Sequence, residues 1–292
     1  MLENIETVVA IVGCQRSGTT LTGQILGAHP NALLIDETDG LYQWFDQIQS
    51  NKTDTDSTKS IFRKADKKYT SNNKRLKQSS TPSSEGENSF ELSSQVTHLV
   101  LKAPNLTYSF SSLANLDIPV KVVYPVRDAR AVVSSMEKLS HIPFVENQIR
   151  WINKSDVIAK RFANELVELS SSKISDNEKR TIVWKIKTGL ASDFSNAGLP
   201  VNLFLYEQLI YNSEEIVSQL ARFTGLPLSD SMLAHENIYV GLGPGGTERF
   251  RPIDGQSLSK WSKIMSSETE AEILRIGSPL LNSLGYCGSP VC

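Results

Sequence analysis

Residues 8–20 read VVAIVGCQRSGTT, and this stretch decides the architecture. The apolar, mostly β-branched run at 8–12 is typical of a parallel strand that is buried on both faces, and it stops at Gly13. Apolar residues then recur at helical spacing until Pro30, where proline ends the pattern. A strand, a glycine-bearing turn and a helix N-terminus together predict a site for a phosphate or sulfate group.

The loop at 13–20 has the glycine spacing of a Walker A motif but lacks its lysine. Gly13 and Gly18 match the two glycines, yet Thr19 stands where a nucleoside triphosphatase has the lysine that binds the β- and γ-phosphates. The cation lies inside the loop instead, as Arg16. This pattern favours transfer of a different group from a nucleotide donor. A P-loop kinase or NTPase, which would need Mg²⁺ and turn over ATP, remains the alternative.

The rest of the chain alternates short apolar runs with amphipathic segments. Strands are predicted at 32–35, 98–101, 120–124 and 201–205, and helices at 129–139, 149–169 and 213–223. The third of these strands is predicted to end at Tyr124, because Pro125 follows it. The alternation predicts an α/β fold, a P-loop-like, three-layer α/β/α arrangement with a central parallel sheet. We expect a single domain over 1–292, with a mobile polar insert or lid at about 50–94.

The insert carries a cluster of basic residues. They are Lys64, Lys67, Lys68, Lys74, Arg75 and Lys77. A solvated charged surface is the simpler interpretation of this cluster, and contact with an anionic partner is the alternative.

The composition excludes several classes of protein. The 292 residues include 30 Lys and Arg and 32 Asp and Glu, so a net charge of −2 leaves no positive field for general nucleic-acid binding. No stretch approaches the ~20 apolar residues of a membrane helix. Cys14, Cys287 and Cys292 have neither metal-site nor disulfide spacing. We therefore expect a cytoplasmic protein that binds no nucleic acid, no membrane and no metal.

A second motif follows the strand predicted at 120–124. Arg127 comes first, and Ser135 follows eight residues later. Arginine provides a planar fork for phosphate oxygens, and the serine lies two helical turns further along. Asp128 permits two other interpretations, an ion pair with Arg127 or a Walker B carboxylate, and neither explains the absent Walker lysine.

Both motifs resemble those of the sulfotransferases, enzymes that use 3′-phosphoadenosine 5′-phosphosulfate (PAPS) and release PAP. Arg-Ser-Gly-Thr-Thr at 16–20 resembles the 5′-phosphosulfate loop of that family, and Arg127 with Ser135 resembles its 3′-phosphate motif. The resemblance implies that the donor is bound by Arg16, Ser17, Gly18, Thr19, Thr20, Arg127, Ser135, Tyr206, Thr247, Arg249 and Arg251.

The similarity is greatest to the tyrosylprotein sulfotransferases. The matching segments are Ala28-His29-Pro30, Asp36-Glu37-Thr38, Leu101-Lys102-Ala103-Pro104, Val126-Arg127-Asp128, Tyr206-Glu207-Gln208-Leu209, Pro244-Gly245-Gly246 and Leu258-Ser259-Lys260-Trp261. By this resemblance Glu37 is the catalytic base, and Arg16 and Lys102 stabilise the transition state. Tyr206 would contact the adenosine end of the donor. The segment after Gly246 is shorter than in those enzymes, so Thr247, Arg249 and Arg251 compete for the remaining phosphate contact.

These residue types also suit the chemistry independently of the resemblance. Sulfuryl transfer, like phosphoryl transfer, passes through a loose in-line transition state, so positioning and cations provide most of the catalysis. Glu37 follows a predicted strand at the edge where α/β sites open, which suits a proton acceptor. Pro104 stands where cytosolic enzymes of the family have a histidine, so His98 is only the fallback base.

Together these observations predict a PAPS-dependent sulfotransferase that acts on a hydroxyl, a phenol or an amine. The expected acceptor is a small or secondary metabolite, with peptide tyrosine and carbohydrate as alternatives. Besides the kinase alternative, a non-catalytic nucleotide-binding protein with the same fold stays open. The sequence assigns no oligomeric state.

Overall fold

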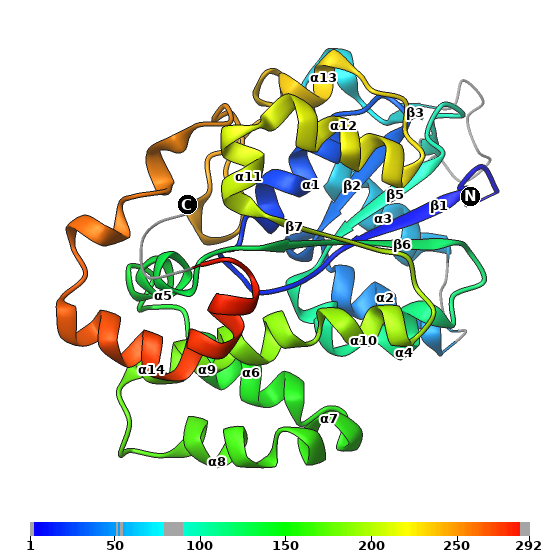
Figure 1. Cartoon of the computed structure of the whole chain (residues 1–292). Coiled ribbons are helices and arrows are strands. Elements are labelled where there is room, and N and C mark those ends of the chain that lie inside the picture. The colour runs from blue at the N-terminus through cyan, green and yellow to red at the C-terminus, as the bar shows by residue number, and fades with distance from the viewer. Residues whose placement is uncertain (1–2, 51, 53–54, 79–89, 287–292) are drawn as a thin grey trace.

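A five-stranded parallel sheet forms the centre of the computed structural model, which describes residues 3–50, 52, 55–78 and 90–286. The strand order is β2-β5-β1-β6-β7 (Figure 1). The strands are β1 Thr7–Ile11, β2 Ala32–Asp36, β5 His98–Lys102, β6 Val120–Val126 and β7 Val201–Leu205. Helices cover both faces of this sheet, which confirms the predicted three-layer α/β/α fold.

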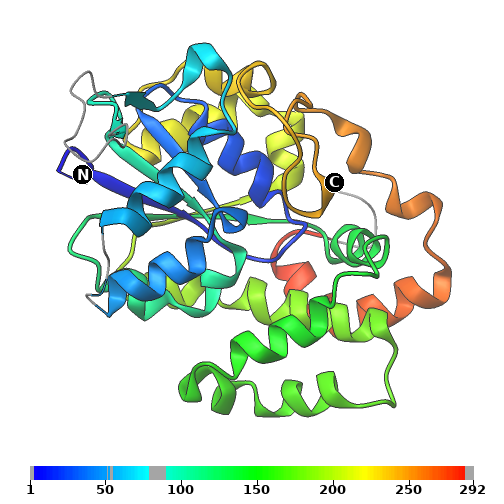
Figure 2. The same ribbon diagram turned by 180° about the vertical axis from the view of Figure 1, so that it is seen from behind.

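The helices divide between the two faces of the sheet. One face carries α1 Thr19–Gly27, α11 Tyr206–Tyr211, α12 Ser213–Thr224 and α13 Asp230–Leu233 (Figure 1). The other carries α4 Phe110–Ala114, α9 Asp176–Gly189 and α10 Ala191–Asn196, and α5 Ala129–Glu137 and α14 Ser267–Ser283 pack on α9. From behind, α2 Leu41–Gln49 and α3 Thr55–Asp66 lie in the foreground (Figure 2). No helix in the described part of the chain combines the length and apolar character needed to cross a bilayer.

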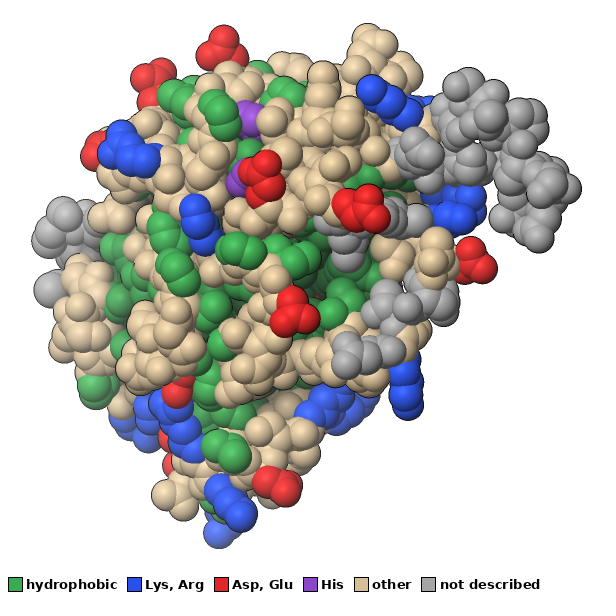
Figure 3. All heavy atoms as spheres, turned by 90° about the vertical axis from the view of Figure 1, so that its right-hand side faces the viewer, with side chains coloured by type: hydrophobic (Ala, Val, Ile, Leu, Met, Phe, Trp, Pro, Cys, Tyr) green, Lys and Arg blue, Asp and Glu red, His purple; other side chains and the backbone are tan. Residues whose placement is uncertain are grey.

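Burial on both faces explains why the strands are apolar without interruption. Every residue of β1, β2 and β5 is buried. Because the strands are parallel, the loops that follow them meet at one edge of the sheet. β1 lies between β5 and β6. The chain adds β2 and β5 on one side of β1 and then β6 and β7 on the other, so the strand order reverses next to the loop that follows β1. On the opposite side, where β1 begins, acidic and basic side chains are interspersed (Figure 3).

β6 continues through Pro125 to Val126, two residues beyond its predicted end. Its pairing with β1 ends at Ile11 and Val123, whereas its pairing with β7 continues to Val126. At Pro125 the strand therefore has a neighbour on one side only. A proline is tolerated there because its missing N–H removes no ladder bond from the open side.

The single long helix predicted at 149–169 is wrong. The chain forms three shorter helices instead, α6 Phe144–Ile152, α7 Asp156–Arg161 and α8 Ala163–Ser170. The hydroxyl of Ser155 accepts a hydrogen bond from the N–H of Ile158 (3.4 Å), and this cap starts a new helix. The apolar residues of these helices pack with α9 in a small second core, which explains their spacing without a continuous helix.

Parts of the insert predicted at about 50–94 pack against the rest of the protein. α3 lies against β2, and its residues Ile61 and Phe62 are buried. β3 Leu76–Gln78 pairs antiparallel with β4 Phe90–Leu92. Residues 79–89 lie outside the described residues, and the lid function stays a prediction.

Two of the six residues in the basic cluster, Lys68 and Arg75, are buried, so a solvated or anion-facing surface is the wrong interpretation for them. Lys68 forms an ion pair with Asp39. Arg75 donates to the backbone oxygens of Ala32 (2.9 Å) and Ala28 (3.2 Å). Arg75 thereby binds a free carbonyl at the end of α1, as basic side chains commonly do at helix C-termini.

Candidate active site

The loop between β1 and α1 is sharply turned. Gly13 and Gly18 have φ angles of 113° and 93°, and Arg16 has a φ of 69°, the only positive value at a non-glycine position in the described residues. The N–H of Gly13 donates to Oγ1 of Thr107 (2.7 Å). A Cβ at residue 18 would overlap the ring of Tyr206, so only glycine fits there. A glycine turn that leads into a helix N-terminus is a common binding site for phosphate and sulfate groups.

A cavity of about 380 Å³, the first cavity, opens beside this loop. Its lining includes Arg16, Gly18, Thr19, Thr20, Arg127, Ser135, Tyr206, Thr247 and Arg251, all predicted to bind the donor. Nε of Arg16 donates to Oγ of Ser135 (2.9 Å), so two motifs 119 residues apart in the sequence are in contact. Ser17 is buried in the same loop, and its Oγ has no partner among the described residues.

Arg127 is held by neighbours that leave one of its nitrogens without a partner. Its guanidinium carbon lies 4.6 Å from the centre of the Tyr206 ring. Nη2 donates to the backbone oxygen of Ser257 (2.6 Å), and Nη1 donates to that of Arg16 (3.2 Å). Nε is buried and has no partner in the described part of the chain. Burial, and then the charge of Arg127, lower the pKa of Arg16, so both cations would gain from a bound anion.

The three competing residues after Gly246 take different positions. Thr247 and Arg251 line the first cavity, and Nε of Arg251 donates to Oδ2 of Asp254 (2.6 Å). Arg249 lines neither this cavity nor the one described next. Its Nη2 donates to Oδ2 of Asp36 (3.0 Å), which draws the guanidinium into the protein. Of the three, Arg249 is the residue that the structure places away from the predicted donor contacts.

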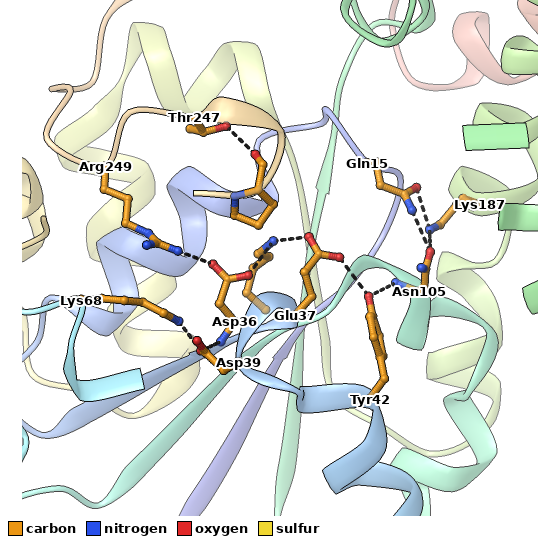
Figure 4. Close-up of polar contacts among 12 residues, drawn as sticks. Gln15, Asp36, Glu37, Asp39, Tyr42, Lys68, Asn105, Lys187, Thr247 and Arg249 are labelled. Carbon is orange, nitrogen blue, oxygen red and sulfur yellow. Dashed lines mark hydrogen bonds and ion pairs between the residues drawn. The ribbon is translucent and has the colours of Figure 1, made fainter. Parts of the chain in front are cut away.

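A second cavity, of about 300 Å³, adjoins the first and contains the predicted catalytic residues. The two cavities share Arg16, Thr19, Thr20 and Gly245 in their linings. Glu37 and Lys102 line the second cavity, and Nζ of Lys102 donates to Oε1 of Glu37 (2.5 Å). The same Nζ lies 3.1 Å from Oδ1 of Asp36. Figure 4 shows Asp36 beside Glu37. Arg16, Glu37 and Lys102 therefore meet around one cavity.

Glu37 is held through both of its carboxylate oxygens. While Lys102 binds Oε1, the hydroxyl of Tyr42 donates to Oε2 (3.1 Å). The backbone N–H of Asn105 in turn donates to the Tyr42 oxygen (3.2 Å). Burial, and then the charge of Glu37, raise the pKa of Tyr42 well above its ordinary value. The phenol therefore stays protonated and keeps the carboxylate oriented.

The buried pair of Asp36 and Lys102 is ionised. Burial alone would raise the pKa of Asp36, but the charges of Lys102, Lys68 and Arg249 lower this pKa below its ordinary value. Burial alone would also lower the pKa of Lys102, but Asp36 and Glu37 together raise it above the ordinary value. Lys102 is therefore a permanent cation beside Glu37, although its side chain is only 1% exposed.

Four residues of this site carry no signal in the sequence. They are Gln15, Asn105, Gln148 and Lys187. The first three line the second cavity, and Lys187 reaches them from α9. Nζ of Lys187 donates to Oε1 of Gln15 (2.9 Å) and to Oδ1 of Asn105 (3.1 Å). Burial lowers the pKa of Lys187 to about 7.

The lowered pKa of Lys187 makes stability depend on pH. Between about 7 and the ordinary lysine pKa of about 10.4, unfolding adds a proton, so the folded state is stabilised as pH rises, and this gain is lost as pH falls through 7. We expect the free energy of unfolding of the wild type, relative to Lys187→Met, to rise by up to ~1.4 kcal/mol per pH unit in this window. Urea unfolding of both proteins measures the difference, and parallel pH profiles would contradict it.

Two residues with alternative interpretations lie away from both cavities. His98 begins β5, and Lys102 ends the same strand at the cavity. His98 lines neither cavity, so the prediction of His98 as a fallback base is wrong. Asp128 caps α5, and its Oδ2 accepts a hydrogen bond from Arg130 (2.7 Å). The proposed ion pair between Asp128 and Arg127 is therefore wrong as well.

A match between the amino-acid sequence and a family model identifies the family of this chain. The model of the sulfotransferase family matches residues 9–173, more than half of the chain. The chain belongs to the sulfotransferase family. This result confirms the resemblance found in the two motifs, and the protein is accordingly a sulfotransferase enzyme.

Relatives and solved structures agree with this family. A Caenorhabditis briggsae protein, named as a candidate protein-tyrosine sulfotransferase, is 23% identical over 298 residues, covering 98% of this chain and 91% of its own. Protein-tyrosine sulfotransferase 1 of Danio rerio is 25% identical over 197 residues, covering 65% and 48%. The sulfotransferase domain of the Synechococcus PCC 7002 olefin synthase has a TM-score of 0.52 at 15% identity, covering 95% of each chain. The sulfotransferase domain from the curacin biosynthetic pathway also has a TM-score of 0.52, at 17% identity, covering 94% of this sulfotransferase and 97% of that domain. These two structures share its fold.

Proposed function

We propose that this sulfotransferase moves the sulfuryl group of PAPS in line onto a hydroxyl, a phenol or an amine, with Glu37 as the base. The observation that carries the proposal is the junction of the two cavities. The first cavity has the β1–α1 loop and Arg127, the second has Glu37 and Lys102, and Arg16 lines both. A group held at this junction has a phosphate loop on one side and a carboxylate on the other, as in-line transfer requires.

The residues of the first cavity fit the charged groups of PAPS. Nε of Arg127, which lines the cavity, and Oγ of Ser17, in the adjoining β1–α1 loop, are buried without partners among the described residues, and buried donors cost free energy until an acceptor satisfies them. Arg16 and the loop would hold the phosphosulfate, and Arg127 with Ser135 would hold the 3′-phosphate. When bound, PAPS supplies a sulfuryl group attached to a phosphate leaving group.

The residues of the second cavity supply the rest of the chemistry. Glu37 takes the proton that the acceptor hydroxyl loses as its oxygen bonds to sulfur. Lys102 stabilises the charge that develops on the transferred oxygens, and Arg16 does the same from the junction. Tyr42 positions Glu37 because its hydrogen bond occupies the oxygen that Lys102 does not reach.

A small metabolite is the proposed acceptor. The volume of the second cavity, about 300 Å³, lies at the lower end of the range for small-molecule sites. Peptide tyrosine is the alternative acceptor, which the names of the two relatives favour. A cytoplasmic location and independence from metal ions belong to the same proposal.

PAP is expected to raise the melting temperature of the protein more than ATP with Mg²⁺ does. A ligand that binds only the folded state stabilises it by RT ln(1 + L/Kd), where L is the free ligand concentration, so at equal concentrations the nucleotide that binds more tightly gives the larger shift. Arg127→Ala should weaken PAP binding about 10- to 100-fold, because a charge-assisted hydrogen bond contributes about 1.5–3 kcal/mol. Thermal denaturation and calorimetric titration measure these two effects.

The matched control for this experiment is Arg222→Ala, because Arg222 is an exposed arginine of α12. That variant should bind PAP as the wild type does. The shift with PAP should also persist in EDTA, because no step of the proposal uses a metal. Stabilisation by ATP with Mg²⁺ but not by PAP would support a P-loop kinase or NTPase and overturn the proposal.

A further inference from the structure

A cluster of carboxamide side chains lines the second cavity. They come from the β1–α1 loop, the segment after β5, and α6. Their bonds converge on Oδ1 of Asn105, which accepts from Nε2 of Gln15 (2.7 Å), Nζ of Lys187 (3.1 Å) and Nε2 of Gln148 (3.3 Å). Figure 4 shows Asn105 between Lys187 on one side and Tyr42, which contacts Glu37, on the other.

The neighbours of these amides determine which way each of them points. Lys187 also donates to Oε1 of Gln15 (2.9 Å), so Gln15 presents its Nε2 to Asn105. Tyr108 donates to Oε1 of Gln148 (3.0 Å), so Gln148 presents its Nε2 as well. A flipped Asn105 would direct its own NH₂ group at three donors. Its oxygen therefore points into the cluster and its Nδ2 points away from it.

Nδ2 of Asn105 is thus a donor of fixed direction at the second cavity. No described residue accepts a hydrogen bond from it, and Asn105 is 8% exposed. Its backbone N–H reaches Glu37 through a single hydroxyl, that of Tyr42 (3.2 Å and 3.1 Å). A donor held in this way discriminates strongly between ligands that carry an acceptor oxygen at that position and ligands that lack one.

We propose that Asn105 selects acceptors that carry a second, uncharged oxygen next to the hydroxyl that receives the sulfuryl group. Nδ2 donates to this second oxygen while Glu37 takes the proton of the reacting hydroxyl. The charged residues that line the cavity are Arg16, Glu37 and Lys102, and each already serves the transfer, so a carboxylate at the second position would have no cation of its own. This inference rests on the proposed function and names its acceptor class as neutral diols, hydroxy-ethers and hydroxy-ketones.

Two matched series of acceptors test the inference. The aromatic series is phenol, guaiacol and catechol, and the alicyclic series is cyclohexanol, trans-2-methoxycyclohexanol and trans-1,2-cyclohexanediol. With radiolabelled PAPS, the wild type should have a kcat/KM at least about tenfold higher for guaiacol than for phenol, or for the methoxy alcohol than for cyclohexanol. The acceptors of one series share the base and the donor, so their ratio isolates recognition of the second oxygen.

Asn105→Asp removes the Nδ2 donor and leaves an oxygen in place for the other residues of the cluster. Aspartate keeps an oxygen for the neighbouring donors but replaces NH₂ with an acceptor. We expect the guaiacol-to-phenol ratio to fall about tenfold. The catechol-to-phenol ratio should stay within about threefold, because the second hydroxyl of catechol donates to the aspartate. Asn147→Asp adds the same charge to the same cavity from α6 and should leave the guaiacol-to-phenol ratio as it is in the wild type.

The outcomes distinguish this inference from the proposed function. If Asn105→Asp does not fold, Asn105→Ala provides the test, and it should bring both ratios close to one. An unchanged guaiacol-to-phenol ratio in the folded variant would overturn the inference. A wild type that binds PAP but transfers to none of the six compounds would overturn it too, and the donor site would stand in both cases. If PAP does not bind, the proposed function itself is overturned.

Discussion

Glu37→Gln is expected to lower kcat about 10³-fold, because a positioned general base contributes about 10²- to 10⁴-fold to the rate. Glutamine keeps the size of the side chain and an oxygen for Lys102 or Tyr42, but it cannot take a proton. The Kd of PAP should stay within about threefold of the wild type, because Glu37 lines only the second cavity. Steady-state turnover with the fastest of the six acceptors measures kcat, and calorimetric titration with PAP measures the donor site.

Glu146→Gln is the matched control for this variant. Glu146 is an exposed carboxylate of α6 that lines neither cavity, so its loss should leave kcat close to the wild-type value. A Glu37→Gln enzyme that binds PAP and turns over like the wild type would remove Glu37 as the base. If the wild type bound PAP and no acceptor reacted with it, the non-catalytic nucleotide-binding alternative would apply instead.

The sheet and the phosphate loop could be predicted because their signals are local. Strands that are buried on both faces need continuous apolar runs, and β1, β2 and β5 are such strands. Parallel strands bring their following loops to one edge, so the residues after β1, β2 and β5 could be assigned to one site without knowing the order of the strands. The assignment of Arg127 and Ser135 to the donor site followed from a motif of the family, and the contact between Ser135 and Arg16 was not predicted.

The roles of single cations could not be predicted, because tertiary packing decides them. Lys185 and Lys187 lie two residues apart on α9, yet the side chain of Lys185 is 47% exposed while Lys187 is completely buried. Arg249 and Arg251 differ in the same way, one turned inward to Asp36 and the other lining the first cavity. Nothing in the neighbouring sequence separates the members of either pair. The carboxamide cluster was missed for the same reason, since its members come from three distant segments.

Arg16→Asn is expected to lower kcat/KM about 10³-fold, because Arg16 lines both cavities and removing one preorganised charge-stabilising group costs about 10²- to 10³-fold. Asparagine is the suitable replacement because it tolerates the positive φ of 69° at this position better than alanine does. The variant therefore removes the cation without adding backbone strain. Arg150→Asn, at an exposed position in α6, should keep wild-type kinetics.

Arg16→Lys tests whether the charge alone is sufficient. Lysine keeps one positive charge but loses the planar fork, which now binds Ser135 through Nε. We expect kcat/KM to fall about 10- to 100-fold relative to the wild type, which is a smaller loss than in Arg16→Asn. Single-turnover kinetics with PAPS separate the transfer step from donor binding. If Arg16→Lys matched the wild type, a point charge at the junction would suffice, and the contact between Arg16 and Ser135 would have no part in the transfer.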